Sequence, residues 1–167
     1  MTKDRLSALL SKQNLGSNFI MLDASDIVMD EAPGVNDELF WYHHGNTKDD
    51  YVSLMQKLNH LYDVMSQGTT IEDMLAWQNR GTELHDTAYS FFTRERAISV
   101  ERLEDGKYHF GGDGRHRILM AQELGMVIPV RVSYDCFAKE TNRRLPNGVE
   151  DLIRNDSRSD IDEYSLE

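Results

Sequence analysis

The segment from Tyr108 to Val132 constrains the fold of this chain more than any other, because it combines a glycine-rich loop with three short elements of regular structure. Two β-like apolar runs enclose the loop and a helix-like run, and a glycine suited to the left-handed conformation ends the helix. In order, the parts are Tyr108–Phe110, Gly111–Gly114, Ile118–Leu124, Gly125 and Val127–Ser133. This order predicts a compact unit with the loop at one end of a sheet, where ligands of α/β proteins commonly bind.

The loop has the composition of an anion-binding site. Gly111, Gly112 and Gly114 remove side chains where the backbone must approach a ligand closely or adopt a positive φ. The first turn of the following helix offers unpaired N–H donors and a partial positive charge. Asp113 can either cap this helix or hold a metal ion bound to phosphates. We therefore predict that the three glycines bind phosphate and that Asp113 is a candidate metal ligand; the alternative is a purely structural turn.

Three basic residues follow the glycines. Arg115 and Arg117 add planar guanidinium groups that fit phosphate oxygens, and His116 can donate, accept or exchange a proton near neutral pH. The alternative for the two arginines is a solvated surface. As catalytic candidates we single out His116 and Asp113, together with Asp23 beside the first predicted strand, where turn formation explains the aspartate equally well.

Further candidates lie upstream of the glycines. Residues Asp30–Asn46 indicate a long ordered loop that carries aromatic side chains and the adjacent His43 and His44. Either histidine could meet the phosphate-binding loop as a general base or ligand, and the alternative is one packed and one solvated histidine. We add Lys48, at the start of the next predicted helix, to the phosphate-binding candidates.

Hydrophobic periodicity predicts the remaining elements. We expect a bent strand over Phe19–Met29, a β-hairpin over Ala97–Phe110 with a turn at Asp105-Gly106, and helices in the middle of the chain. The helices are expected to begin at Thr47, Thr70 and Thr82, whose hydroxyl groups suit the N-cap position. Large residues at helical spacing are assigned to the core: Met55, Tyr62, Met74, Trp77, Phe91 and Phe92.

Composition limits the class of protein. The 167 residues fit one domain, and a net charge of −11 argues against broad nonspecific binding to DNA. Cys136 is the single cysteine, which rules out an internal disulfide and a cysteine-rich zinc site. No apolar run is long enough to cross a bilayer, and the first residues lack the features of a secretion signal, so we expect a cytoplasmic protein with no membrane partner.

The stretch Tyr108–Val132 resembles the signature of the ParB/sulfiredoxin superfamily. In that signature a glycine-containing loop with basic residues opens a helix, and an Ile-Pro-Val strand follows. Here the loop is Gly114–Arg117, and the strand contains Ile128-Pro129-Val130. The match is local, with weaker support from the expected order of the strand Ile20–Asp26 and of the helix from Lys48.

The resemblance implies an α+β fold with a small mixed β-sheet, packed helices and a helical insertion in the middle. On this basis we expect a single domain over residues 1–167, with a core at 19–134 and a polar C-terminal extension at 135–167. The resemblance also implies that Gly114–Arg117 binds the phosphates of a nucleoside triphosphate or diphosphate, usually with Mg²⁺. Members hydrolyse CTP, transfer phosphate from ATP or ADP, or are described as nucleases.

Two departures from the family narrow this expectation. Sulfiredoxins place a catalytic cysteine just after the glycine, where this chain has Arg115, so we do not expect reduction of cysteine sulfinic acid. DNA-partitioning members carry a helix-turn-helix domain after this one, whereas only a short polar segment follows Val132, so we do not expect chromosome partitioning. The residues Trp41–Asp50 with Asp113–Arg117 are also similar, more loosely, to ParB-like domains of bacterial polymorphic toxins, which implies a toxin-type effector with an immunity partner.

Two classes of function therefore follow from the sequence. In the first, the chain is a nucleotide-dependent enzyme, a phosphotransferase, NTPase or nuclease in which the arginines neutralise phosphate charge and His116 or a carboxylate transfers the proton. In the second, the same loop binds an anion without catalysis, and the helical middle supplies a surface for a protein partner or a second copy of the chain.

Overall fold

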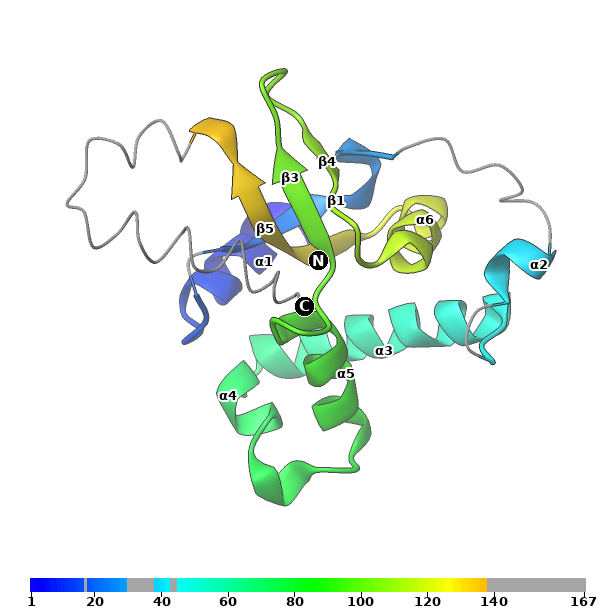
Figure 1. Ribbon diagram of the computed structural model, residues 1–167. Helices are drawn as coiled ribbons and strands as arrows, with labels where there is room; N and C mark the ends of the chain where they lie inside the picture. The colour runs from blue at the N-terminus through cyan, green and yellow to red at the C-terminus, as the bar shows by residue number, and fades with distance from the viewer. Residues whose placement is uncertain (17, 30–37, 43–44, 138–167) are drawn as a thin grey trace.

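A computed structural model describes residues 1–16, 18–29, 38–42 and 45–137 of the chain, and it has a mixed α+β architecture (Figure 1). In the described residues a five-stranded sheet has the spatial order β1-β5-β3-β4-β2. The strands are β1 (Phe19–Asp23), β2 (Ile27–Val28), β3 (Ser99–Arg102), β4 (Tyr108–Phe110) and β5 (Val127–Asp135). The sheet is mixed, because β1–β5 and β3–β4 pair antiparallel while β3–β5 and β2–β4 pair parallel.

The helices gather mainly on one side of this sheet. Figure 1 shows α3, α4 and α5 below the strands, α6 beside them, and the β3–β4 hairpin projecting away from the helices. The α-helices are α1 (Lys3–Ser11), α2 (Glu38–Trp41), α3 (Lys48–Ser66), α4 (Ile71–Met74), α5 (Glu83–Phe92) and α6 (Arg115–Leu124). Two short 3₁₀ helices are η1 (Ala24–Asp26) and η2 (Trp77–Asn79).

One continuous core joins the sheet to these helices. Its fully buried side chains come from α1, α3, α4, α5, β3, α6 and β5, and they include Leu6, Met55, Ile71, Phe91, Val100, Ile118 and Ile128. The leucines of α1 belong to this core, since Leu6 and Leu10 are buried. The hydrophobic core of the described residues therefore includes α1, which precedes β1.

Threonine caps begin the helices of the middle segment, as predicted. The hydroxyl oxygen of Thr70 accepts from the N–H of Asp73 at 3.0 Å, and that of Thr82 accepts from the N–H of His85 at 3.2 Å. At the start of α3, the carboxylate of Asp50 accepts from the N–H of Thr47 at 2.8 Å. These bonds satisfy donors that the first turn of a helix leaves without a partner.

Most predicted elements are confirmed. The bent strand over Phe19–Met29 is β1 and β2 with η1 between them, and the hairpin is β3 and β4. The helix after the glycines is α6, which ends at Gly125 with φ of 66°. The final strand extends to Asp135, beyond its predicted end at Ser133.

Two predictions in the first half of the chain need correction. The segment Asp30–Asn46 is not a loop throughout, because its described part contains α2, and Trp41 at the end of α2 is 2% exposed. Trp77, which the helical spacing assigns to the core, is 77% exposed. The reason is that α4 ends at Met74 and η2 follows, so Trp77 no longer lies on the buried face of α4.

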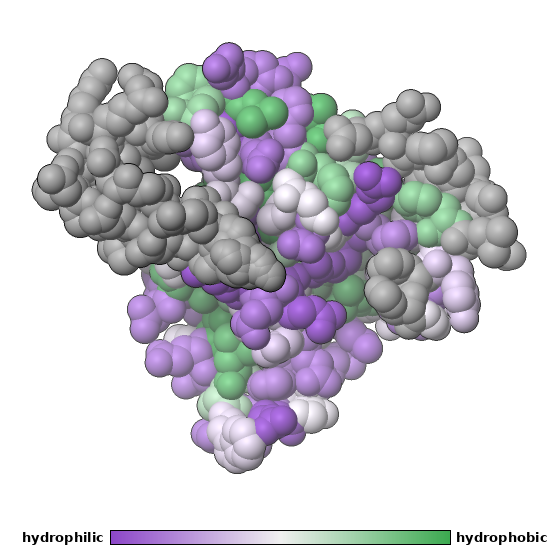
Figure 2. Space-filling model, viewed as in Figure 1, coloured by the Kyte–Doolittle hydropathy of each residue, from purple (hydrophilic) through white to green (hydrophobic). Residues whose placement is uncertain are grey.

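The surface in view is mostly hydrophilic. Figure 2 shows separate, small hydrophobic areas among larger hydrophilic ones. None of the helices in the described part of the chain combines the length and the apolar character that crossing a bilayer requires.

Candidate anion-binding site

The predicted phosphate loop, Gly111–Gly114, links β4 to α6 and lies beside the start of β3 (Figure 1). Ser99, which is 2% exposed, holds it there through three hydrogen bonds. The Ser99 N–H donates to the Asp113 carbonyl at 3.0 Å, and the Ser99 carbonyl accepts from the Gly111 N–H at 2.9 Å. The Ser99 hydroxyl accepts from the Asp113 N–H at 3.2 Å. The loop is thus fixed to the sheet before any ligand binds.

Two of the loop glycines are required by packing against β3. A Cβ atom on Gly114 would lie 2.7 Å from Cγ1 of Ile98, and Gly114 has φ of 99°. A Cβ atom on Gly111 would lie 3.0 Å from the backbone of Ser99. Gly112 differs, because it has φ of 115° but no atom within 4 Å of its Cβ position. Contact with the sheet therefore explains why positions 111 and 114 are glycine, without any need for a ligand. Gly112 is exposed, and glycine is favoured there only because the backbone has a positive φ.

The N-terminus of α6 has the features of an anion-binding position. Gly114 is its N-cap residue and has no side chain that could accept from the first-turn N–H groups. No acidic residue lies in the first turn, which begins with Arg115. The positive end of the helix dipole is consequently not balanced within the helix itself. Such an end can bind an anion directly through its backbone N–H groups.

Asp113 lies just before this helix end but does not cap it. Its side chain is exposed, and no hydrogen bond to its carboxylate is found among the described residues. In the described part of the chain no group of three or more metal-binding side chains occurs. A Mg²⁺ ion typically takes one or two carboxylates together with substrate phosphates and water. Asp113 therefore fits a supporting ligand for Mg²⁺ that is already held by phosphate, and a stand-alone metal site is not formed by the described residues.

Arg117 points into the protein and not toward the helix end. Its Nη1 donates to the carbonyl oxygen of Ser90 in α5 at 2.6 Å, and its guanidinium lies 5.5 Å from the ring centroid of Phe91. Burial, with a smaller contribution from the charge of Arg96, lowers the pKa of Arg117 to about 10. The sequence predicted Arg117 as a phosphate ligand, with a solvated surface as the alternative; in the structure its side chain joins α6 to α5.

Arg96 is a basic residue of this region that the sequence reasoning missed. Its side chain is exposed, in the turn between α5 and β3, and its charge acts on the buried guanidinium of Arg117. Arg115, at the first position of α6, is partly exposed, with its guanidinium 5.5 Å from the ring centroid of Phe110. The two arginines of Arg94-x-Arg96, immediately before a predicted strand, could have indicated this basic residue from the sequence. Arg115 is thus the basic residue at the first position of α6, while the charge of Arg96 acts on the guanidinium of Arg117.

His116 is held by an aromatic cluster. Its Nε2 lies 2.7 Å from the carbonyl oxygen of Phe40, and because a carbonyl can only accept, Nε2 carries the hydrogen. The imidazole stacks on the ring of Tyr51 with centroids 5.3 Å apart and also contacts the rings of Phe40 and Trp41. The main effect of these contacts is to attach α2 and α3 to the first turn of α6.

The remaining predicted site residues are not brought to the loop by the described contacts. Lys48 forms an ion pair of 3.3 Å with Glu123, near the C-terminal end of α6. Asp23 precedes η1, which packs on that same end of α6 through hydrogen bonds from Gln122 to the carbonyls of Ala24 and Ile27. His43 and His44 lie outside the described residues.

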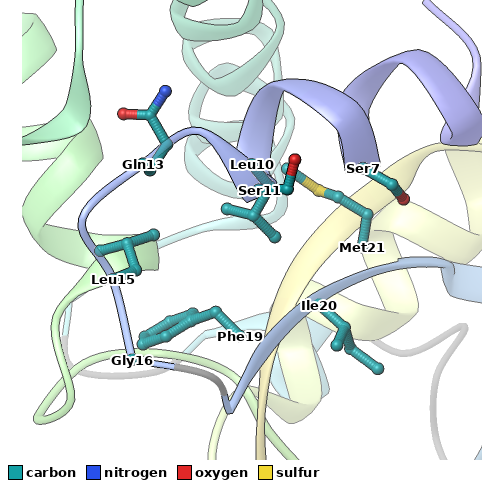
Figure 3. Close-up of a pocket in the computed structure, with 9 residues that line it drawn as sticks. All are labelled: Ser7, Leu10, Ser11, Gln13, Leu15, Gly16, Phe19, Ile20 and Met21. Atoms are coloured by element: carbon teal, nitrogen blue, oxygen red, sulfur yellow. The ribbon is translucent and has the colours of Figure 1, made fainter.

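A pocket of about 280 Å³ lies away from this loop, between α1 and β1 (Figure 3). Leu10, Phe19 and Met21 provide much of its apolar wall, while Ser7 and Ser11 line it from α1. None of the predicted site residues contributes to it. The pocket is therefore separate from the candidate anion-binding site.

Comparisons of this chain with protein-family models, with curated proteins and with solved structures found no match.

Proposed function

We propose that this chain binds a phosphate group at the N-terminus of α6. The observation that carries the proposal is that α6 begins at a glycine held in a left-handed conformation, so its first-turn donors have no N-cap side chain. Arg115 adds positive charge at the first position of α6, in a protein with a net charge of −11. Local positive charge and backbone N–H groups together favour a compact anion over an extended polyanion.

The phosphate belongs to a nucleotide in this proposal, with Mg²⁺ as its counterion. The resemblance of Tyr108–Val132 to ParB-like loops supports a nucleotide, and the exposed carboxylate of Asp113 supports the ion. Without a cation, Asp113 would repel a phosphate bound beside it. Binding is therefore expected to depend on Mg²⁺ for nucleoside triphosphates and diphosphates.

Binding without catalysis is favoured by the surroundings of His116. A general base accepts a proton on the ring nitrogen that carries no hydrogen, and because Nε2 of His116 donates to the carbonyl of Phe40 at 2.7 Å, that role would fall to Nδ1 of a ring packed against Phe40 and Trp41. The ring also stacks on Tyr51. We therefore propose a nucleotide-responsive binding module as the leading function, with phosphoryl transfer or hydrolysis as the second candidate.

The proposal is tested by thermal unfolding in the presence of ATP, ADP, CTP, GTP and pyrophosphate, each with and without Mg²⁺. A ligand that binds only the folded state raises the midpoint, by the equivalent of about 2.7 kcal/mol at a hundredfold excess over its Kd. We expect a rise for at least one nucleotide that is reduced in Arg115→Ala and retained in Arg5→Ala, an exposed arginine of α1. No rise with any of these ligands would refute the proposal.

The two candidate functions are separated by following the nucleotide itself. Phosphorus NMR of a Mg²⁺-nucleotide incubated with the protein shows whether phosphate is released or transferred. The binding module predicts an unchanged nucleotide together with a raised unfolding midpoint. Product formation that disappears in Arg115→Ala would establish the enzyme in its place.

A further inference from the structure

A second pocket, of about 630 Å³, is lined by residues of η2, of α5 and of the segments next to them. Its lining is rich in aromatic and charged side chains, which are Trp77, Arg80, His85, Asp86 and Tyr89. Trp77 is 77% exposed and Tyr89 is 37% exposed. Tryptophan, tyrosine and arginine are the residues most enriched among those that dominate binding energy at protein interfaces. An exposed group of these three residue types is therefore a candidate binding site for another protein.

The aromatic rings of this pocket are arranged to receive a cation. The guanidinium of Arg80 lies 4.1 Å from the ring centroid of Trp77, so one face of the indole already binds a positive group. On α5, the rings of His85 and Tyr89 stack with centroids 6.2 Å apart. The faces of such rings carry negative electrostatic potential and attract ammonium and guanidinium groups.

Acidic groups around the rings add to this preference. The Oδ1 of Asp86 lies 3.0 Å from Nδ1 of His85, and the Asp86 side chain is 68% exposed. The hydroxyl of Tyr89 donates to Oε2 of Glu95 at 3.2 Å. Between Thr70 and Arg96 the chain carries three guanidinium groups and five carboxylates, of which Asp86 lines the pocket; all five carboxylates are exposed: Glu72, Asp73, Glu83, Asp86 and Glu95. Figure 2 shows a largely hydrophilic surface at the lower end of the molecule.

We infer that the pocket between η2 and α5 is a docking site for a basic segment of a protein partner, which inserts a lysine or arginine side chain beside Trp77 and Asp86. The excess of carboxylates in this segment and the exposed side chain of Asp86 favour a cationic segment over nucleic acids and nucleotides. The inference does not depend on phosphate binding at α6, because the lining residues of this pocket come from a different part of the chain.

The test uses a synthetic peptide in which arginine alternates with alanine, and a matched peptide with glutamate in place of arginine. Binding is followed by the indole N–H resonance of Trp77 in nitrogen-15 NMR spectra, assigned by its loss in Trp77→Phe. We expect a saturable shift with the arginine peptide at low ionic strength and none with the glutamate peptide or with AMP. Affinity should fall about tenfold in Asp86→Asn and stay unchanged in Glu104→Gln, an exposed carboxylate between β3 and β4 and outside the pocket lining.

Arg80→Gln is the most direct test of cation binding at Trp77, because the Arg80 guanidinium competes with an incoming cation for the indole ring. The inference predicts tighter binding of the arginine peptide after this substitution. Weaker binding of that peptide, a preference for the glutamate peptide or for AMP, or no saturable shift would overturn it. All the substituted side chains are exposed, and thermal unfolding of each variant verifies that the fold is retained.

Discussion

At the scale of single residues, the loop glycines have two different roles. The sequence predicted that Gly111, Gly112 and Gly114 make room for a ligand, whereas the structure shows that two of them make room for β3. The sequence could not distinguish these roles, because the contact between Gly114 and Ile98 depends on how β3 pairs with β4. The positive φ of Gly112 and Gly114 was accessible from sequence, since glycine is the residue that adopts it readily.

Gly114→Ala is expected to destabilise the protein by about 2–4 kcal/mol, from the left-handed backbone and from the clash with Ile98 combined. Gly112→Ala is the matched control, because it shares the positive φ but has open space around it, and it should cost about 1 kcal/mol. Chemical denaturation of both variants measures the difference. Equal costs would show that Ile98 does not restrict the loop.

Arg117→Ala is expected to lower the free energy of unfolding by about 2–4 kcal/mol, because it leaves a cavity and removes the donor to the Ser90 carbonyl. Arg117→Met should cost less, since methionine refills the space without a buried charge. Urea denaturation of the two variants provides the comparison. A stability unchanged in Arg117→Ala would mean that the guanidinium is directed to solvent, which is the alternative that the sequence left open.

At the scale of elements, periodicity and caps predicted α3, α5, α6 and the hairpin, because each has its own local signal. The predictions failed where the structure depends on contacts between residues that are distant in the sequence. In α2, Trp41 is buried against Tyr51 and His116, which no local pattern reveals. Trp77 lies at helical spacing from Met74 in the sequence, but α4 ends at Met74, so the spacing does not place Trp77 in the core. The antiparallel pairing of β1 with β5 was likewise beyond local signals, because these strands lie far apart in the sequence.

Tyr62 connects α3 to β5, and its burial predicts a dependence of stability on pH. Its hydroxyl donates to the Val127 carbonyl at 2.8 Å, and burial raises its pKa well above the ordinary value of 10.0. Because the folded-state pKa exceeds the unfolded one, the stabilisation is complete below pH 10.0 and is lost as the pH rises further. Above that pH, stability should fall by up to about 1.4 kcal/mol per pH unit from this group.

Tyr62→Phe isolates this contribution. At neutral pH the variant should lose about 1–2 kcal/mol, because the Val127 carbonyl is left without its donor. Between pH 10 and pH 11 its stability should fall less steeply than that of the unmodified protein. The free energy of unfolding of both proteins is measured by denaturation at each pH. If it falls with pH at the same rate in both, Tyr62 does not ionise on unfolding.

At the scale of the whole molecule, α1 and the sheet share one core, so the described residues should unfold together. Leu6→Ala is expected to reduce stability by about 2–5 kcal/mol, because Leu6 is 1% exposed. Leu9→Ala, a partly buried neighbour, should cost less. Calorimetry should show a single transition in both variants. A separate low-temperature transition in Leu6→Ala would mean that α1 is not part of the cooperative unit.

Binding of phosphate at the N-terminus of α6 is tested most directly by an NMR titration of the nitrogen-15-labelled protein with pyrophosphate and with Mg²⁺-nucleotides. Direct contact with the first-turn N–H groups predicts saturable shifts concentrated at the backbone amides of Gly112 to His116, weakened in Arg115→Ala and preserved in Arg5→Ala. Shifts confined to other parts of the chain, or none at saturating ligand, would contradict it and leave Gly111–Gly114 as a turn required by packing against β3.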